Sequence, residues 1–171
     1  MSHGHSRPRS GDLLLFYGGC RLGWWIERAT RSPFYHVALY DNGGYVIDAG
    51  PRGVVRRRVD DGTTGRRYVV APAPEGHGEA ALAWAKEQIG RPFDALGMFV
   101  VLGHLALGRA PLPYRPSRRF TCSHLVAEAF LQAGAELVPG RDPGMVVPGD
   151  FAWLAAAEDL ARAWHRGSSS G

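Results

Sequence analysis

The stretch Phe120-Thr121-Cys122-Ser123-His124-Leu125-Val126-Ala127-Glu128-Ala129-Phe130 combines the start of a helix with a cysteine. Thr121 is of the type that caps helix N-termini, and the apolar spacing after it predicts a helix that Gly134 ends. Cys122 then lies on the first turn, where backbone N–H groups and the helix dipole favour an anion. Such a cysteine is a candidate nucleophile because the thiolate is the reactive form. A buried, inert cysteine is the alternative interpretation.

A cysteine nucleophile needs a nearby base, and His36 is the candidate with a defined position. The run from residue 34 to 40 alternates and is rich in β-forming residues, so it predicts a strand. In that strand His36, Ala38 and Tyr40 share one face, and Tyr35, Val37 and Leu39 share the other. The other histidines lie on the wrong side of the cysteine helix, in an apolar segment, in a linker or near the C-terminus (His124, His104, His77 and His165).

Asp48 is the candidate third group, since a carboxylate beside His36 would orient the ring and stabilise its charged form. Whether it reaches His36 depends on the hairpin loop. A two-residue turn at Asn42-Gly43 places Asp48 opposite Val37, on the wrong face. A three-residue loop at 41–43, with glycine in the left-handed conformation, places Asp48 opposite His36.

The remaining pattern predicts an α+β fold in which an antiparallel meander packs against helices. In the helix at 79–89 we expect Ala80, Ala83, Trp84 and Ile89 on the inner face. Asp150 is the expected N-cap of a last helix that continues to Ala163. The expected strands are 13–17, 34–40, 45–49, 54–59 and 67–71, and the other expected helices are 22–30 and 93–107.

Length and composition predict a single globular domain at residues 11–164, between a disordered tail at 1–10 and a flexible one at 165–171. Two cysteines do not make a disulfide framework. We expect no cofactor and no metal site, because His3 and His5 lie in the polar N-terminal segment. No secretory signal is visible, and the apolar run at 95–107 is too short for a transmembrane span, so a cytoplasmic protein is expected.

The chain carries a net charge of +4, with arginine clusters at 56–58, 66–67 and 118–119. These clusters lack the interleaved aromatic residues of nucleic-acid binding surfaces, and no nucleic-acid partner is expected. We interpret them as solvated faces and strand edges. Binding to an anionic surface remains the alternative.

Several segments together resemble the circularly permuted branch of the NlpC-type papain-like hydrolases (YiiX/YebB-like proteins and, more distantly, lecithin–retinol acyltransferases). The resemblance covers about residues 11–155. It rests on the order and spacing of the segments GDLL (11–14), SPFYHVALY (32–40), GYVIDA (44–49), GRPFD (90–94) and TCSHLV (121–126).

The resemblance implies a permuted papain-like fold, with Cys122 as nucleophile, His36 as base and Asp48 as third group. We expect Tyr35, Phe93 and Ser123 to bind the substrate. Phe93 stands where non-permuted relatives have a cleft-lining tyrosine, and Thr121 stands where they have aspartate.

The expected function is therefore a cysteine-dependent hydrolase that cleaves an amide or related acyl bond through a thioester. The substrate would be a small peptide, an amide or a lipid conjugate, with the bacterial envelope as one source. Two alternatives remain at this point. One is acyl transfer to a second nucleophile, and the other is an inert binding module of the same fold.

Overall fold

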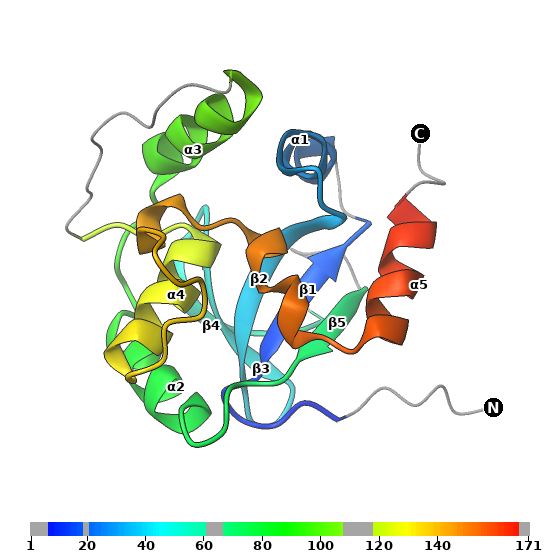
Figure 1. The fold of residues 1–171 in the computed structure, drawn as a ribbon. Helices are drawn as coiled ribbons and strands as arrows, with labels where there is room; N and C mark the ends of the chain where they lie inside the picture. The colour runs from blue at the N-terminus through cyan, green and yellow to red at the C-terminus, as the bar shows by residue number, and fades with distance from the viewer. Residues whose placement is uncertain (1–6, 19–20, 61–66, 108–117, 168–171) are drawn as a thin grey trace.

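A single antiparallel sheet organises the protein, as the computed structural model in Figure 1 shows for residues 7–18, 21–60, 67–107 and 118–167. The α+β class and the antiparallel sheet are confirmed. Within the described residues the sheet has five strands in the order β4-β3-β2-β1-β5. The strands are β1 (Leu13–Tyr17), β2 (Phe34–Asp41), β3 (Tyr45–Gly50), β4 (Gly53–Arg58) and β5 (Tyr68–Ala71).

Helices pack around this sheet and follow the expected positions along the chain. The α-helices are α1 (Arg21–Thr30), α2 (Gly78–Glu87), α3 (Ala95–Leu107), α4 (Cys122–Gln132) and α5 (Ala157–Gly167). Two 3₁₀ helices, η1 (Pro143–Met145) and η2 (Pro148–Leu154), connect α4 to α5. Cys20 and the expected tail residues 1–6 and 168–171 lie outside the described residues.

The hairpin of β2 and β3 has a three-residue loop, but its register differs from both predicted registers. Asp41 pairs with Tyr45, so the loop is residues 42–44. Continuing this register places Asp48 beside Ala38, one pair away from His36 along the same face. Gly43 and Gly44 both have positive φ, at 73° and 80°, which explains why the extra loop residue is accommodated.

The predicted four-strand meander is wrong at its last strand. β2, β3 and β4 do form a meander, but β5 pairs with β1 on the opposite edge of the sheet. The pairing joins Leu14 to Val70 and Leu15 to Val69. The cause is burial: both strands are almost continuously apolar, and their pairing extends the core beneath the helices.

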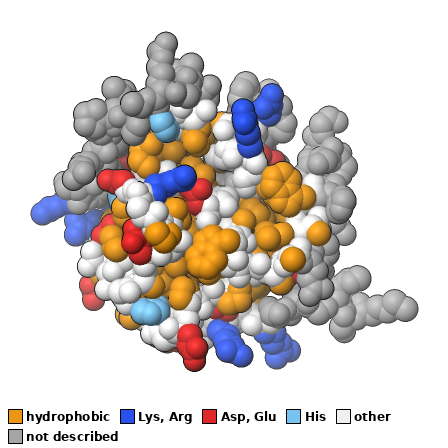
Figure 2. All heavy atoms as spheres, in the orientation of Figure 1, with side chains coloured by type: hydrophobic (Ala, Val, Ile, Leu, Met, Phe, Trp, Pro, Cys, Tyr) orange, Lys and Arg blue, Asp and Glu red, His pale blue; other side chains and the backbone are white. Residues whose placement is uncertain are grey.

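The sheet separates a large core from a small one. The large core joins alternate residues of the strands to α2, α4, η2 and α5. The small core, on the other face, contains Leu14, Phe16, Ala38 and Val46, with Ile26 of α1 packed against it. On the face shown in Figure 2, apolar side chains gather over the middle, and charged side chains lie mostly around the edge.

Two helix predictions are corrected. The buried residues of α2 are Gly78, Ala81, Leu82 and Ala85. Of the predicted face, Trp84 packs against the large core as expected, but Ala80 and Ala83 are exposed and Ile89 is 46% exposed. Alanines lie on several sides of this helix, so the sequence pattern does not determine which stripe of the helix is buried.

The predicted last helix is two elements, because the chain is extended at Ala155, between η2 and α5. Asp150 lies inside η2, where its carboxylate accepts a hydrogen bond from the N–H of Val147 at 2.8 Å. α5 continues to Gly167.

Candidate functional site

Cys122 is the first residue of α4, and Thr121 caps that helix as predicted. The Thr121 hydroxyl accepts a hydrogen bond from the N–H of His124 at 3.2 Å. Cys122 is a free, half-buried thiol. The N–H groups of Cys122 and Ser123 belong to the first turn of the helix. The N–H groups of a first turn have no hydrogen-bond acceptor within the helix. The sulfur therefore lies beside backbone donors that can stabilise negative charge.

A β-bulge in β2 sets the direction of His36. Phe16 pairs with His36, but Tyr17 pairs with Phe34, so Tyr35 is an extra residue in β2. The rings of Tyr35 and His36 are 6.3 Å apart and nearly parallel, at 30°. Successive residues of a regular strand point to opposite faces, so this stacking requires the bulge. The expected alternation, with Tyr35 on the face of Val37, is wrong for this reason.

His36 and Cys122 come together, although 86 positions of sequence separate them. Cys122 is among the groups that raise the pKa of His36, so the two side chains lie close together. Burial disfavours the charged ring, but attraction to Asp48 and then to Cys122, with polar contacts to both, outweighs burial. The pKa of His36 is therefore raised from 6.5 to about 10. An imidazolium beside the sulfur is the arrangement that favours a thiolate.

Asp48 faces the ring from the other side. Its Oδ1 atom lies 2.7 Å from Nε2 of His36, and the two side chains are 6% and 12% exposed. Because Nε2 faces Asp48, Nδ1 is the nitrogen left for the thiol. The contact is an ion pair without the angle of a hydrogen bond.

Arg57 is a member of this cluster that the sequence analysis missed. It was assigned with its neighbours to a solvated face, but its side chain is only 5% exposed, and its Nε donates to Oδ2 of Asp48 at 2.5 Å. Burial favours the neutral acid, but attraction to His36 and then to Arg57 holds the pKa of Asp48 below its usual 3.8. The available signal was the alternation of β4, which places Arg57 on the same face as Val55.

The two neighbours of Arg57 are also paired with acids. Arg56 contacts Asp41 at 2.6 Å, and Arg58 contacts the exposed Asp60 at 3.0 Å. The cluster at 56–58 therefore has acidic partners within the protein.

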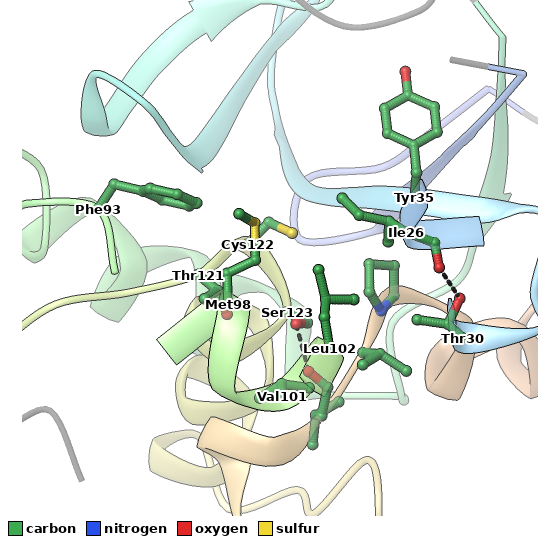
Figure 3. A pocket seen from close by; sticks show the side chains of 13 residues that line it. Ile26, Thr30, Tyr35, Phe93, Met98, Val101, Leu102, Thr121, Cys122 and Ser123 are labelled. Carbon is green, nitrogen blue, oxygen red and sulfur yellow. Dashed lines mark hydrogen bonds between the residues drawn. The ribbon is translucent and has the colours of Figure 1, made fainter. Parts of the chain in front are cut away.

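Cys122 opens onto a hollow of about 420 Å³, counted out to its open mouth (Figure 3). Its lining is almost entirely apolar and comes from α1, β2, α3, the start of α4 and the segment at 146–148. The lining residues are Ile26, Thr30, Tyr35, Phe93, Met98, Val101, Leu102, Thr121, Cys122, Ser123, Val146, Val147 and Pro148.

The three expected substrate-binding residues all line this hollow, in different ways. The ring of Phe93 extends toward Cys122, whereas the hydroxyl of Tyr35 points away from it (Figure 3). Ser123 is buried, and its hydroxyl donates to the carbonyl of Val146 at 2.5 Å. Tyr35 and Phe93 thus contribute apolar surface, and Ser123 ties the segment at 146–148 to α4.

Backbone pairing brings Phe93 beside the thiol. Phe93 and Phe120 form a parallel bridge, in which the Phe120 N–H donates to Pro92 O at 3.2 Å and the Asp94 N–H donates to Phe120 O at 3.0 Å. The buried Asp94 then accepts a hydrogen bond from the Gly97 N–H at 2.9 Å, which starts α3. One short segment therefore positions both a wall residue and a wall helix of the hollow.

No protein-family model matches the chain, and neither does any curated protein. Among the described residues, no three His, Cys, Asp or Glu side chains converge as a metal ion would require. No helix of the described segments is long and apolar enough to cross a bilayer. The arrangement of Cys122, His36, Asp48 and the apolar hollow is what bears on function.

Proposed function

We propose that the protein is a cysteine-dependent hydrolase that cleaves an amide or related acyl bond whose acyl group is apolar. The observation that carries this proposal is the proximity of His36 to Cys122, which lies at the wall of an apolar hollow. The permuted papain-like fold is part of the same proposal. It is supported by the order of the chain, in which the histidine hairpin precedes the cysteine helix.

The reaction follows from the geometry. The Cys122 thiolate attacks the carbonyl carbon and forms a C–S bond, and N–H groups at the start of α4 hold the oxyanion. His36 gives its proton to the leaving nitrogen or oxygen as the carbonyl bond to it breaks. A water molecule, deprotonated by His36, then attacks the thioester, and the carboxylic acid leaves as the Cys122 thiolate reforms. Asp48 holds the ring of His36 in place throughout and stabilises its protonated form.

The lining of the hollow favours an apolar acyl group over a peptide. Its walls are aliphatic and aromatic, and the Ser123 hydroxyl is already bonded to Val146. A peptide would bring amide groups into a hollow with few polar partners, which is unfavourable. Each buried methylene contributes about 0.8 kcal/mol, so each adds about fourfold to kcat/KM while the chain stays within the hollow.

The first prediction is tested with p-nitrophenyl esters from acetyl to octanoyl. For the wild type we expect kcat/KM to rise with chain length by about fourfold per methylene at first, and Cys122→Ala to abolish turnover. Leu102→Phe, which narrows the hollow, should reduce the preference for long chains. Leu105→Phe, on the same helix but outside the lining, is the matched control.

Two outcomes count against the proposal. Turnover that survives in Cys122→Ala excludes the cysteine mechanism. Equal kcat/KM for acetyl and octanoyl esters excludes the hollow as the acyl site. An inert binding module would show no turnover with any ester.

A further inference from the structure

Arg57 is a buried cation on the strand next to Asp48. β3 and β4 pair Val46 with Arg57 and Asp48 with Val55, so Arg57 and Asp48 are diagonal neighbours on the face of the small core. Arginine is seldom fully buried without a partner, because removing its charge from water is costly. A fixed interaction must therefore offset this cost.

Contacts from Asp48, Arg58 and Phe16 help to fix the guanidinium group. Nε donates to Oδ2 of Asp48 at 2.5 Å, and Nη1 donates to the carbonyl of Arg58 at 3.0 Å. The Cζ atom lies 5.9 Å from the ring centroid of Phe16, and that ring is 5.6 Å from the ring of His36. Phe16, which is fully buried, therefore packs against both Arg57 and His36.

We propose that Arg57 is a positioning residue, which holds Oδ2 of Asp48 so that Oδ1 faces Nε2 of His36. This inference rests on the proposed hydrolase function. A carboxylate has a broad torsional preference about its last bond, so packing alone does not fix its orientation. The two oxygens of Asp48 are divided between two cations, one at 2.5 Å and the other at 2.7 Å.

The positive charge of Arg57 also weakens the attraction between the Asp48 carboxylate and the protonated His36 ring. The titratable and charged groups at this position are Cys122 on α4, Asp48 on β3, Arg57 on β4 and, in the same small core, Tyr35, Tyr40 and Tyr68. Arg57 is permanently charged, so it shares the carboxylate with the imidazolium. When this charge is removed, the Asp48 carboxylate no longer interacts with Arg57. Its attraction to His36 is then stronger, which favours the protonated ring.

The second prediction compares Arg57→Gln and Arg57→Lys with Arg56→Gln. The control breaks a similarly short contact to a buried acid, Arg56 to Asp41, on the same strand but facing the large core. With p-nitrophenyl octanoate, Arg57→Gln should lower kcat by about ten- to a hundredfold through misplacement of His36. KM should change less than about twofold, because Arg57 does not line the hollow.

The pH profile separates positioning from a structural role. In Arg57→Gln the basic limb of the kcat/KM profile should move to higher pH, because the His36 ring keeps its proton up to a higher pH. Arg57→Lys keeps the charge but loses the planar fork, so the limb should stay in place while kcat remains below wild type. Arg56→Gln should leave both the limb and kcat at wild-type values.

The inference is overturned if Arg57→Gln folds and shows wild-type kcat and limb, or if Arg56→Gln causes the same losses. If Arg57→Gln does not fold, Arg57→Lys decides: wild-type kcat overturns the inference, and a lowered kcat with an unmoved limb supports it. An inactive wild type, in which iodoacetamide alkylates Cys122 no faster than an ordinary thiol, overturns the hydrolase function and this inference together. An active wild type with an unaffected Arg57→Gln overturns only the role of Arg57.

Discussion

At the scale of single residues, the reactivity of the site depends on the pair formed by Cys122 and His36. The helix start offers backbone donors to the sulfur, and His36 offers a positive charge beside it. Both contributions stabilise the negative charge on the sulfur when it acts as a nucleophile. The charge of His36 is the larger of the two, because a full charge in a buried site exceeds the partial charge of a helix end.

The third prediction concerns alkylation by iodoacetamide at pH 7. Cys122 should react faster than Cys20, and His36→Ala should slow Cys122 by about tenfold or more because the thiolate loses its charged partner. Peptide mass spectrometry distinguishes the two thiols. His77→Ala is the control, since His77 contacts the carbonyl of Ala133 at the far end of α4. Equal rates at both cysteines would contradict the assignment of Cys122 as nucleophile.

The residue types explain why Cys122, His36 and Asp48 were predictable as candidates and Arg57 was not. A cysteine at a helix start, and a histidine and an aspartate in apolar strands, break the local pattern visibly. Arg57 lies between two other arginines, so the charge of the run outweighed the one available signal, its position on the face of Val55 in β4. The three-dimensional partner at Asp48 makes the difference.

At the scale of the elements, the hairpin loop decides where Asp48 lies. Loop residues 42–44 set Asp48 beside Ala38, and Gly44 carries two interactions: its N–H donates to the Tyr40 hydroxyl at 3.2 Å, and its carbonyl accepts from the Val59 N–H at 2.9 Å. The positive φ of Gly44 makes this geometry possible.

The fourth prediction is that Gly44→Ala lowers the free energy of unfolding by about 1 kcal/mol or slightly more, the cost of a side chain in the left-handed region. No atom lies within 4 Å of the added Cβ, so the cost comes from the backbone alone. Gly50→Ala, also in open space but without positive φ, is the matched control and should change stability by less than about 0.5 kcal/mol. Urea unfolding measures both. Equal effects would contradict the role assigned to the loop.

Alternation predicts the face of a residue but not its exact partner. Asp48 lies on the predicted face with His36. Its position opposite Ala38 on β2, however, differs from both predicted registers. The bulge at Tyr35 left no signal in the sequence, because it follows from how β1 and β2 meet rather than from local residue type. For the same reason, β5 appeared to continue the meander, although long-range burial pairs it with β1.

At the scale of the whole molecule, His36 keeps its proton at pH values where it would lose it in the unfolded chain. The pKa of His36 is raised from 6.5 to about 10 in the folded protein, through Asp48 and Cys122 against the opposing effect of burial. The stability that this provides is complete below pH 6.5 and is lost as the pH rises through about 10. Asp48 acts at the acid end: its pKa is lowered, so its contribution is present above pH 3.8 and is lost as the pH falls through the folded-state value.

The fifth prediction is that the free energy of unfolding falls between pH 7 and pH 9 more steeply in the wild type than in His36→Gln. In this window His36 binds up to one more proton in the folded state than in the unfolded state, so this residue makes the slopes differ by up to about 1.4 kcal/mol per pH unit. Urea unfolding at pH 7, 8 and 9 measures both proteins, with His77→Gln as a control of the same chemistry outside the cluster. Parallel slopes in wild type and His36→Gln would mean that the proton is not held at His36. If Cys122→Ser shows the same steep slope of unfolding free energy against pH as the wild type, the larger part of the effect comes from Asp48. Asp48 is then the remaining anion beside the ring.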